Sequence, residues 1–542
     1  MVGGGWRWSP SVAPLSRVTE TLLALTAILA TLAGVTLLAP RLRLPQPLAL
    51  ALAGVALAMV PAMRNLDLDP NLILFGFLPP LLYADAFQTS WRDFKRWLRP
   101  ILMLAIGLVA VTILVVGLVA KWCLPDLPWV ACFVLGAVVS PTDTVAVQAV
   151  IERLRVPRRM TAIVGGESLV NDATGLVGVQ IGVVVALNGS FSWGHATVQF
   201  AQVAGLGILI GVGIGALFTL AHKRIREPQV AFTISLLAPY LAFALATLAD
   251  ASGVLAVVTA GAVVAWRVHV IAPVARLQLR AAWGQLTFLL NGLCFLYIGL
   301  KSPCLLAAAA QAGPGLWQAG LWVSAAVIGT RLLWCWPNAY LPLRLSKRLR
   351  EREGGYPQPS GVLLVSWCGV RGAVSLAAAL SLPVEAGDGP FPGREAIVAC
   401  TLAVILSTLL LQGGTLFPLV KLLGLDDDGT TAQELRHARE RLLESGIGRL
   451  DAFCSEQSCP VAVHRFRESM AEELGALRAD DDAERSRAAQ RLAVSREVRA
   501  AVVQAQETAL LRLRDSGAID DQAYNDLLVE LDHALAPAHR PG

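Results

Sequence analysis

Long apolar stretches separated by short polar loops fill most of the chain up to about residue 425. A helix needs about 20 apolar residues to cross a bilayer. We count thirteen such stretches, with charged residues gathered between them. The pattern predicts an all-α polytopic membrane protein with about thirteen transmembrane helices, at 19–39, 45–61, 71–88, 100–120, 128–151, 160–187, 198–221, 229–249, 252–269, 281–300, 315–341, 359–382 and 395–422.

Composition agrees with this class and divides the chain in two. The chain is 55% hydrophobic and 16% charged, which is far less charge than a soluble domain carries. From Asp426 onward there are 23 acidic and 15 basic residues, whereas the preceding part holds 17 acidic and 30 basic residues. We therefore predict a transmembrane domain over 1–425 and an acidic, soluble helical tail over 426–542. Regulatory and purely structural roles both stay open for the tail.

The basic residues are distributed unequally between the loops. Loops and span ends after odd-numbered spans carry 21 Lys and Arg residues, and those after even-numbered spans carry 4. Short cytoplasmic loops hold the excess of positive charge in membrane proteins. The alternation predicts that the amino terminus lies outside and that the tail is cytoplasmic.

The fifth and twelfth spans contain residues that interrupt helices. Pro141 in the fifth lacks a backbone donor, and Gly369 and Gly372 bracket Arg371 in the twelfth. Spans one to six and eight to thirteen form two sets of six, which an odd span between them would invert. Broken helices at matching places in inverted repeats indicate the binding site of a secondary transporter. Two ordinary kinks are the alternative.

Four acidic residues fall well inside spans: Asp85, Asp143, Glu167 and Asp172. Ionisable groups at membrane depth are costly, and they usually face a partner or a water-filled path. A run from Met160 to Leu187 that is otherwise almost free of charge contains two of them. Such a helix is hard to explain unless an ion visits it, so the chain is expected to move an ion.

Oxygen-bearing side chains surround one of these acids. Ser168 and Asp172 are four residues apart and share one helical face with Asn171. Thr142 and Asp143 follow the break at Pro141. Hydroxyl, amide and carboxylate oxygens are hard donors that suit a small alkali cation. A buried carboxylate resists ionisation, so it holds either a proton or a cation, and this competition predicts exchange.

Several of the intramembrane residues have two open interpretations. Glu167 either forms a structural ion pair with Arg371 or contacts the ion. Asp143 is either a supporting ligand or a stabiliser of the helix break. Asp85 either reaches the ion or lines the pore, and Arg331 is expected to snorkel or to compensate a helix dipole.

The motifs that carry these residues resemble the monovalent cation/proton antiporter family, which includes the bacterial NhaP-type and animal NHE-type sodium/proton exchangers. They occur in family order and extend over the whole membrane body. The matching pieces are FLPPLLYADAF (77–87), SPTDTVAV (140–147), GESLVNDATG (166–175), FLLNGLCFLYIGL (288–300) and SWCGVRGAVSLA (366–377).

The resemblance implies a fold of two inverted six-helix repeats, a homodimer, and a core domain that moves against a dimerisation domain. It implies an exchange centre at Asp172, the carboxylate shared by proton and ion, with Asn171 beside it. Ser168 and Thr142 would join Asp172 as sodium ligands, and Asp143 would lie on the crossing helix.

Two further features follow from the resemblance. The family pairs the acid matching Glu167 with the arginine matching Arg371, and relatives with Asn at the position of Asn171 tend to exchange one cation for one proton. Many relatives also have an acid where this chain has Ala84, whereas here the acid comes one residue later, at Asp85. That shift of about 100° on a helix puts its contact with the ion in question.

The leading hypothesis is therefore an electroneutral sodium/proton antiporter, and a potassium/proton antiporter with the same mechanism is the near alternative. The other classes considered are a cation channel and an intramembrane aspartyl protease that would use Asp143 and Asp172. No enzyme activity, cofactor or nucleic-acid partner is expected. The expected partners are membrane lipid, a second copy of the chain and the transported cation and proton, in a plasma membrane, namely a bacterial inner membrane.

Overall fold

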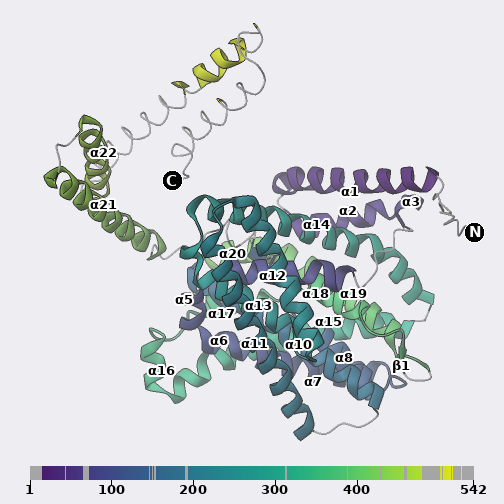
Figure 1. Ribbon diagram of the computed structural model, residues 1–542. Coiled ribbons are helices and arrows are strands. Elements are labelled where there is room, and N and C mark those ends of the chain that lie inside the picture. The colour runs from purple at the N-terminus through teal and green to yellow at the C-terminus, as the bar shows by residue number, and fades with distance from the viewer. Residues whose placement is uncertain are drawn as a thin grey trace, which may run out of the picture. The chain divides into compact units, whose positions relative to one another are not determined.

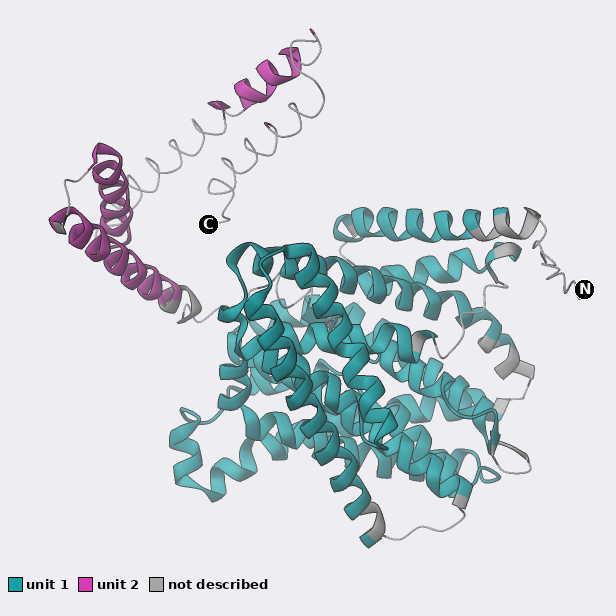
Figure 2. Ribbon diagram, viewed as in Figure 1, with its two compact units in different colours: residues 1–427 teal, residues 428–542 magenta. Residues whose placement is uncertain are grey.

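The computed structural model of the chain is α-helical and divides into two compact units, residues 1–427 and 428–542 (Figures 1 and 2). The functions given above to the two parts stay predictions. The structure describes residues 15–42, 44–64, 72–145, 147, 148, 151, 154, 156–188, 193–311, 314–386, 389–425, 430–456, 460–478, 501, 502, 504–513, 516 and 527.

Each of the thirteen predicted spans coincides with helical residues. Eight described helices have the length and apolar composition to cross a membrane, and three shorter apolar helices accompany them. The elements of the first unit are α1 (Leu15–Leu42), α2 (Gln46–Leu57), α3 (Pro61–Arg64), η1 (Leu72–Phe77), α4 (Leu78–Gln88), α5 (Trp91–Arg96), α6 (Leu98–Leu102), η2 (Met103–Leu108), α7 (Val109–Cys123), α8 (Trp129–Val138), α10 (Arg158–Asn188), α11 (Trp193–Arg224), α12 (Pro228–Leu248), α13 (Gly253–Trp266), η3 (Val268–Val270), α14 (Pro273–Gln311), α15 (Pro314–Leu345), α16 (Lys347–Arg352), α17 (Pro359–Trp367), α18 (Ala373–Leu380), the short antiparallel strands β1 (Glu385–Ala386) and β2 (Gly389–Pro390), α19 (Arg394–Thr408), η4 (Leu409–Gly413) and α20 (Gly414–Leu423).

The fifth and twelfth spans are broken where the sequence predicts. Helix α8 ends at Val138 and helix resumes at Val145, with Pro141 in the gap. Helix α17 ends at Trp367 and α18 begins at Ala373. A proline cannot donate its backbone bond, and glycines weaken a helix, so each span becomes two half-helices.

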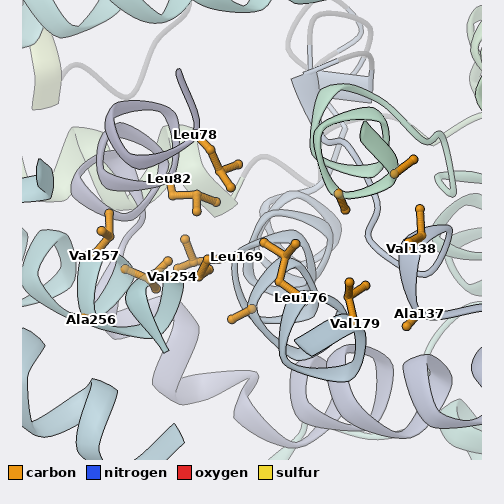
Figure 3. Packing of buried hydrophobic residues seen from close by; sticks show 14 of the residues in the cluster. Leu78, Leu82, Ala137, Val138, Leu169, Leu176, Val179, Val254, Ala256 and Val257 are labelled. Carbon is orange, nitrogen blue, oxygen red and sulfur yellow. The ribbon is translucent and has the colours of Figure 1, made fainter. Parts of the chain in front are cut away.

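Small and branched apolar side chains hold α10 against its neighbours. In Figure 3, leucines and valines of α10 lie between those of α4 and α13 on one side and those of α8 on the other. A Cβ on Gly175 of α10 would come within 2.7 Å of the Pro141 ring, so only glycine lets the two backbones approach this closely. Close approach between small residues drives helix association in a bilayer. The contact between Gly175 and Pro141 places the middle of α10 against the first break.

The second unit contains a pair of helices, α21 (Thr430–Glu456) and α22 (Val461–Arg478). Arg467 of α22 and Asp451 of α21 form an ion pair at 2.5 Å, and a second pair joins Arg478 to Glu444. These contacts are exposed and contribute little stability. The remainder of the predicted helical tail lies mainly outside the described residues.

Candidate functional site

The two broken helices meet at their breaks. The backbone N–H of Asp143, in the first break, donates to the carbonyl oxygen of Val370, in the second, at 2.8 Å. The amino end of a helix carries partial positive charge and its carboxyl end partial negative charge. The crossing thus gathers four half-helix ends inside the protein, and each needs a compensating partner.

The Asp143 carboxylate accepts hydrogen bonds at the amino ends of the two half-helices that follow the breaks. Its Oδ1 accepts a hydrogen bond from the N–H of Val145 at 2.9 Å, and its carboxylate also accepts one from the backbone of Ala373, the first residue of α18. Gly372 lies so close that a Cβ there would collide with the Asp143 carboxylate. Of the two interpretations open for Asp143, these contacts favour the stabiliser of the helix breaks.

The Arg371 side chain donates hydrogen bonds at the carboxyl ends of the two half-helices that precede the breaks, α8 and α17. Its Nε donates to the carbonyl oxygen of Val139 at 2.9 Å, just after α8, and its Nη1 donates to the carbonyl oxygen of Gly369, just after α17. Its backbone N–H donates to Oγ1 of Thr408 on α19 at 3.1 Å. The positive charge therefore lies against the negative ends of two helix dipoles.

The predicted ion pair between Glu167 and Arg371 was wrong, because Glu167 pairs with Arg331. Both nitrogens of the Arg331 fork donate to the Glu167 carboxylate, with Nη2 to Oε2 at 2.8 Å, and Nη2 also donates to the carbonyl oxygen of Val365 at 2.9 Å. The interpretation of Arg331 as a snorkelling residue was wrong as well. Helix α15 continues to Leu345, so Arg331 lies well inside it and its side chain is 1% exposed.

The residues predicted to bind the ion lie together where α10 meets the first break. Ser168 Oγ donates to the carbonyl oxygen of Thr142 at 2.8 Å, and Asn171 Nδ2 donates to Thr142 Oγ1 at 2.6 Å. Asp172 is buried beside them. Its Oδ1 and the Oδ1 of Asn171 have no hydrogen-bond partner among the described residues. Two buried acceptor oxygens without donors are suited to a bound cation or proton.

Asp85 lines two cavities. One cavity of about 430 Å³ extends along α4, α5 and the start of α10, and another of about 230 Å³ lies against α2 and α14. Asp85, Gln88 and Gln148 line both. The carboxylates of Asp143 and Asp85 also interact electrostatically with that of Asp172. The partly buried Asp85 side chain thus adds negative charge where polar cavities approach the site.

Sequence reasoning missed the contributions of Arg331 and Thr408, and of the glutamines Gln88 and Gln148. Arg331 and Thr408 act on partners 164 and 37 residues away, which no local pattern reveals. One signal was available for Arg331, because few basic residues lie inside spans and each buried charge needs a partner. Both glutamines are exposed to the cavities and carry no motif.

A buried acid midway along a membrane helix, set against two crossing broken helices and near polar cavities, defines the class of secondary ion transporters. Comparison with known proteins agrees. The family model "Sodium/hydrogen exchanger, transmembrane" matches residues 25–422. The chain therefore belongs to the sodium/hydrogen exchanger family. It is a multi-pass membrane transporter for cation/proton antiport and not an enzyme.

Individual relatives extend this similarity over nearly the whole chain. An uncharacterized Na⁺/H⁺ exchanger of Mycobacterium tuberculosis is 35% identical over 522 residues, which cover 94% of this chain and 95% of the relative. A sodium, potassium, lithium and rubidium/H⁺ antiporter of Bacillus pumilus is 32% identical over 443 residues, covering 78% of this chain and 64% of that protein. The solved sodium proton antiporter MjNhaP1 from Methanocaldococcus jannaschii is similar in fold, with a TM-score of 0.58, 21% identity, and coverage of 75% of this chain and all of that one.

Proposed function

We propose that the chain is a sodium/proton antiporter in which Asp172 binds either Na⁺ or H⁺. The observation that carries this proposal is the pair of buried, unpartnered oxygens, Asp172 Oδ1 and Asn171 Oδ1, beside the break that contains Thr142. With the Ser168 hydroxyl and the Thr142 carbonyl and hydroxyl, they form a set of hard oxygen donors that suits Na⁺.

Competition at one carboxylate couples the two fluxes. A cation that reaches Asp172 finds the carboxylate either ionised, in which case the cation binds, or protonated, in which case it is excluded. Asp143 is held by backbone donors, Glu167 pairs with Arg331, and Asp85 lines the cavities, so Asp172 is the buried acid whose charge is left to the transported ion. If the protein changes its facing only when Asp172 is neutralised, each Na⁺ moves against one H⁺. Asn171 adds no second titrating group, which favours electroneutral exchange.

Asp85 acts on the path to the site in this proposal. It lines both cavities with Gln88 and Gln148, and its charge attracts cations toward Asp172. Ala84, one residue before Asp85, is fully buried. We therefore assign Asp85 to cation entry and to the field around the site.

A pair of close helix contacts supports alternating access through inverted repeats. Gly54 on α2 leaves no room for a Cβ against the carbonyl oxygen of Leu296 on α14, and Gly261 on α13 does the same against the carbonyl oxygen of Tyr83 on α4. In both cases the added Cβ would also meet the residue three positions after that carbonyl, Gly299 in the first contact and Ala86 in the second. The inverted repeats map the second span onto the ninth and the third onto the tenth, which relates one contact to the other.

The arrangement of the molecule in the membrane is part of the proposal. The loop charges favour an external amino terminus and a cytoplasmic tail, in the inner membrane of a bacterium. We expect a homodimer, as in the family that the motifs resemble. The cavity beside Asp93 and Arg158 opens toward the basic end of the bundle, so the described conformation would face the cytoplasm.

Potassium is the alternative substrate, because the Bacillus pumilus relative is named for sodium, potassium, lithium and rubidium. The test is proton flux in vesicles that contain the full-length protein, on addition of Na⁺, Li⁺ or K⁺ across a pH series. Sodium-driven proton release that is unchanged by an imposed membrane potential is expected. A response to K⁺ alone would remove sodium from the proposal, and conductance without a counter-gradient would indicate a channel.

A further inference from the structure

One end of the membrane body carries a dense group of basic and aromatic side chains. We call residues 91–99, 158, 159 and 344–356 the basic belt; they include eleven Lys and Arg residues and three Asp and Glu residues. Figure 1 shows the belt elements α5, α6 and α16 at the end of the bundle that lies opposite β1. The belt is thus a feature of one membrane face.

Two of its three acids tie the belt together. Glu353 is buried and accepts two hydrogen bonds from Arg99, at 2.6 and 3.0 Å, and Arg159 lies 3.8 Å from it. Asp93 pairs with Arg158 at 2.8 Å. Three loops that are far apart in the sequence therefore form one connected surface, and these two carboxylates are occupied within it.

Seven of the other eight basic residues of the belt are exposed. No ion pair joins them to an acid within the part of the chain that the structure describes. The exposed members of this set are Arg92, Lys95, Arg96, Arg344, Lys347, Arg348 and Arg352.

Aromatic and aliphatic side chains accompany these charges at the level where a membrane surface would lie. The Lys95 ammonium is 5.1 Å from the centre of the Trp91 ring, and the Arg350 guanidinium is 5.5 Å from that of Tyr356. Leu345, the last residue of α15, is 80% exposed. Tryptophan and tyrosine gather at membrane interfaces, and a short helix with basic and apolar residues lies in the interface plane.

We propose that the basic belt binds the anionic headgroups of phospholipids in the leaflet that it faces. The charge of the belt is complementary to a phosphate-bearing surface, and clusters of four to eight basic residues next to a membrane span attract anionic lipid. The exposed Leu345 side chain enters the acyl boundary while Lys347, Arg348 and Arg352 meet the phosphates. Anionic lipid thereby holds the ends of α5, α6, α15 and α10 in one layer.

Thermal unfolding of the full-length protein in an uncharged detergent tests this, with phosphatidylglycerol, phosphatidylcholine or inorganic phosphate added in increasing amounts. The test variant is Lys347→Gln/Arg348→Gln/Arg352→Gln. The matched control removes the same charge from exposed residues at the end of α11 and in the loop that follows it, as Lys223→Gln/Arg224→Gln/Arg226→Gln. No transport is measured, so the result is independent of the proposed function.

Phosphatidylglycerol is expected to raise the unfolding temperature of the wild type and the control at equal concentrations. The belt variant should need at least about tenfold more phosphatidylglycerol for the same rise in unfolding temperature, because each basic residue near the surface adds to the attraction. A second variant, Arg92→Gln/Lys95→Gln/Arg96→Gln, should behave like the first if α16 is not merely needed for folding. Equal lipid dependence in both belt variants and the wild type would overturn the proposal, as would equal stabilisation by phosphatidylcholine or by phosphate alone.

Discussion

Glu167 on α10 and Arg331 on α15 form a two-pronged ion pair in which each side chain is 1% exposed. The pair joins the helix that carries Asp172 to the helix that precedes the second broken span. Charges removed from water are costly, and their mutual attraction offsets that cost only when both are present. The Glu167–Arg331 pair therefore stabilises the position of α10, and the loss of either partner leaves a buried, unpaired charge.

Replacing Arg331 with Met is expected to destabilise the protein by about 3–5 kcal/mol, because Glu167 would remain buried and unpaired. Thermal unfolding in detergent and the yield of folded protein measure this. The double variant Glu167→Met/Arg331→Met should recover much of the stability, since neither charge is then left alone. The pairing described here would be wrong if Arg331→Met were as stable as the wild type and Arg371→Met lost stability that a second substitution, Glu167→Met, restored.

Asp172→Asn is expected to abolish exchange while the protein still inserts and folds, because an amide has no proton to exchange near neutral pH and no negative charge to bind the cation. Sodium-dependent proton flux in vesicles measures the loss. Asp126→Asn, at an exposed position in the loop before α8, is the control and should transport normally. Flux retained in Asp172→Asn would remove the carboxylate from the mechanism.

Competition for one site makes sodium binding depend on pH in a defined direction. As the pH falls, the protonated fraction of the site rises, so the apparent KM for Na⁺ should rise and approach a tenfold increase per pH unit, while the maximal rate at saturating Na⁺ changes less. Initial rates over a grid of pH and Na⁺ concentration measure both. An apparent KM that is constant over the whole range in which transport occurs would show that proton and cation do not share a site.

Gly372→Ala is expected to impair both folding and transport, because the added methyl group would collide with the Asp143 carboxylate that serves both half-helix amino ends. Overpacking of this kind typically costs about 1–3 kcal/mol. Gly329→Ala is the matched control: it lies inside α15, and no atom of a neighbour lies within 4 Å of where its added methyl group would be, so it should be neutral or slightly stabilising. Similar unfolding temperatures and transport rates for the two variants would contradict the role given to Asp143.

Asp85→Asn is expected to raise the apparent KM for Na⁺ by about tenfold, because removing a charge from the cavities lowers the local cation concentration. Exchange itself should continue, since Asp172 is intact. Asp85→Glu keeps the charge and should restore much of the affinity. The effect should weaken at high ionic strength, where charges are screened. Complete loss of exchange in Asp85→Asn would instead make Asp85 a direct ligand.

The sequence was sufficient for those features that depend on local chemistry. The helical stretches follow from apolar length, and the breaks follow from Pro141 and from the glycines around Arg371, because these residues act on the backbone at their own positions. The grouping of Ser168, Asn171 and Asp172 follows from helical spacing. The hydrogen bonds from Ser168 and Asn171 to Thr142 then joined that group to the first break.

Taken alone, the sequence determined that the protein is a multi-pass helical membrane protein with a buried acid at the centre of one helix, because apolar length and charge depth are properties of the chain itself. The tertiary structure decided which charges compensate one another. Both arginines are buried, and both lie far from Glu167 in the sequence, so the choice between them depended on how α10 and α15 pack. That packing leaves Arg331 facing the carboxylate, whereas the ends of two broken helices surround Arg371.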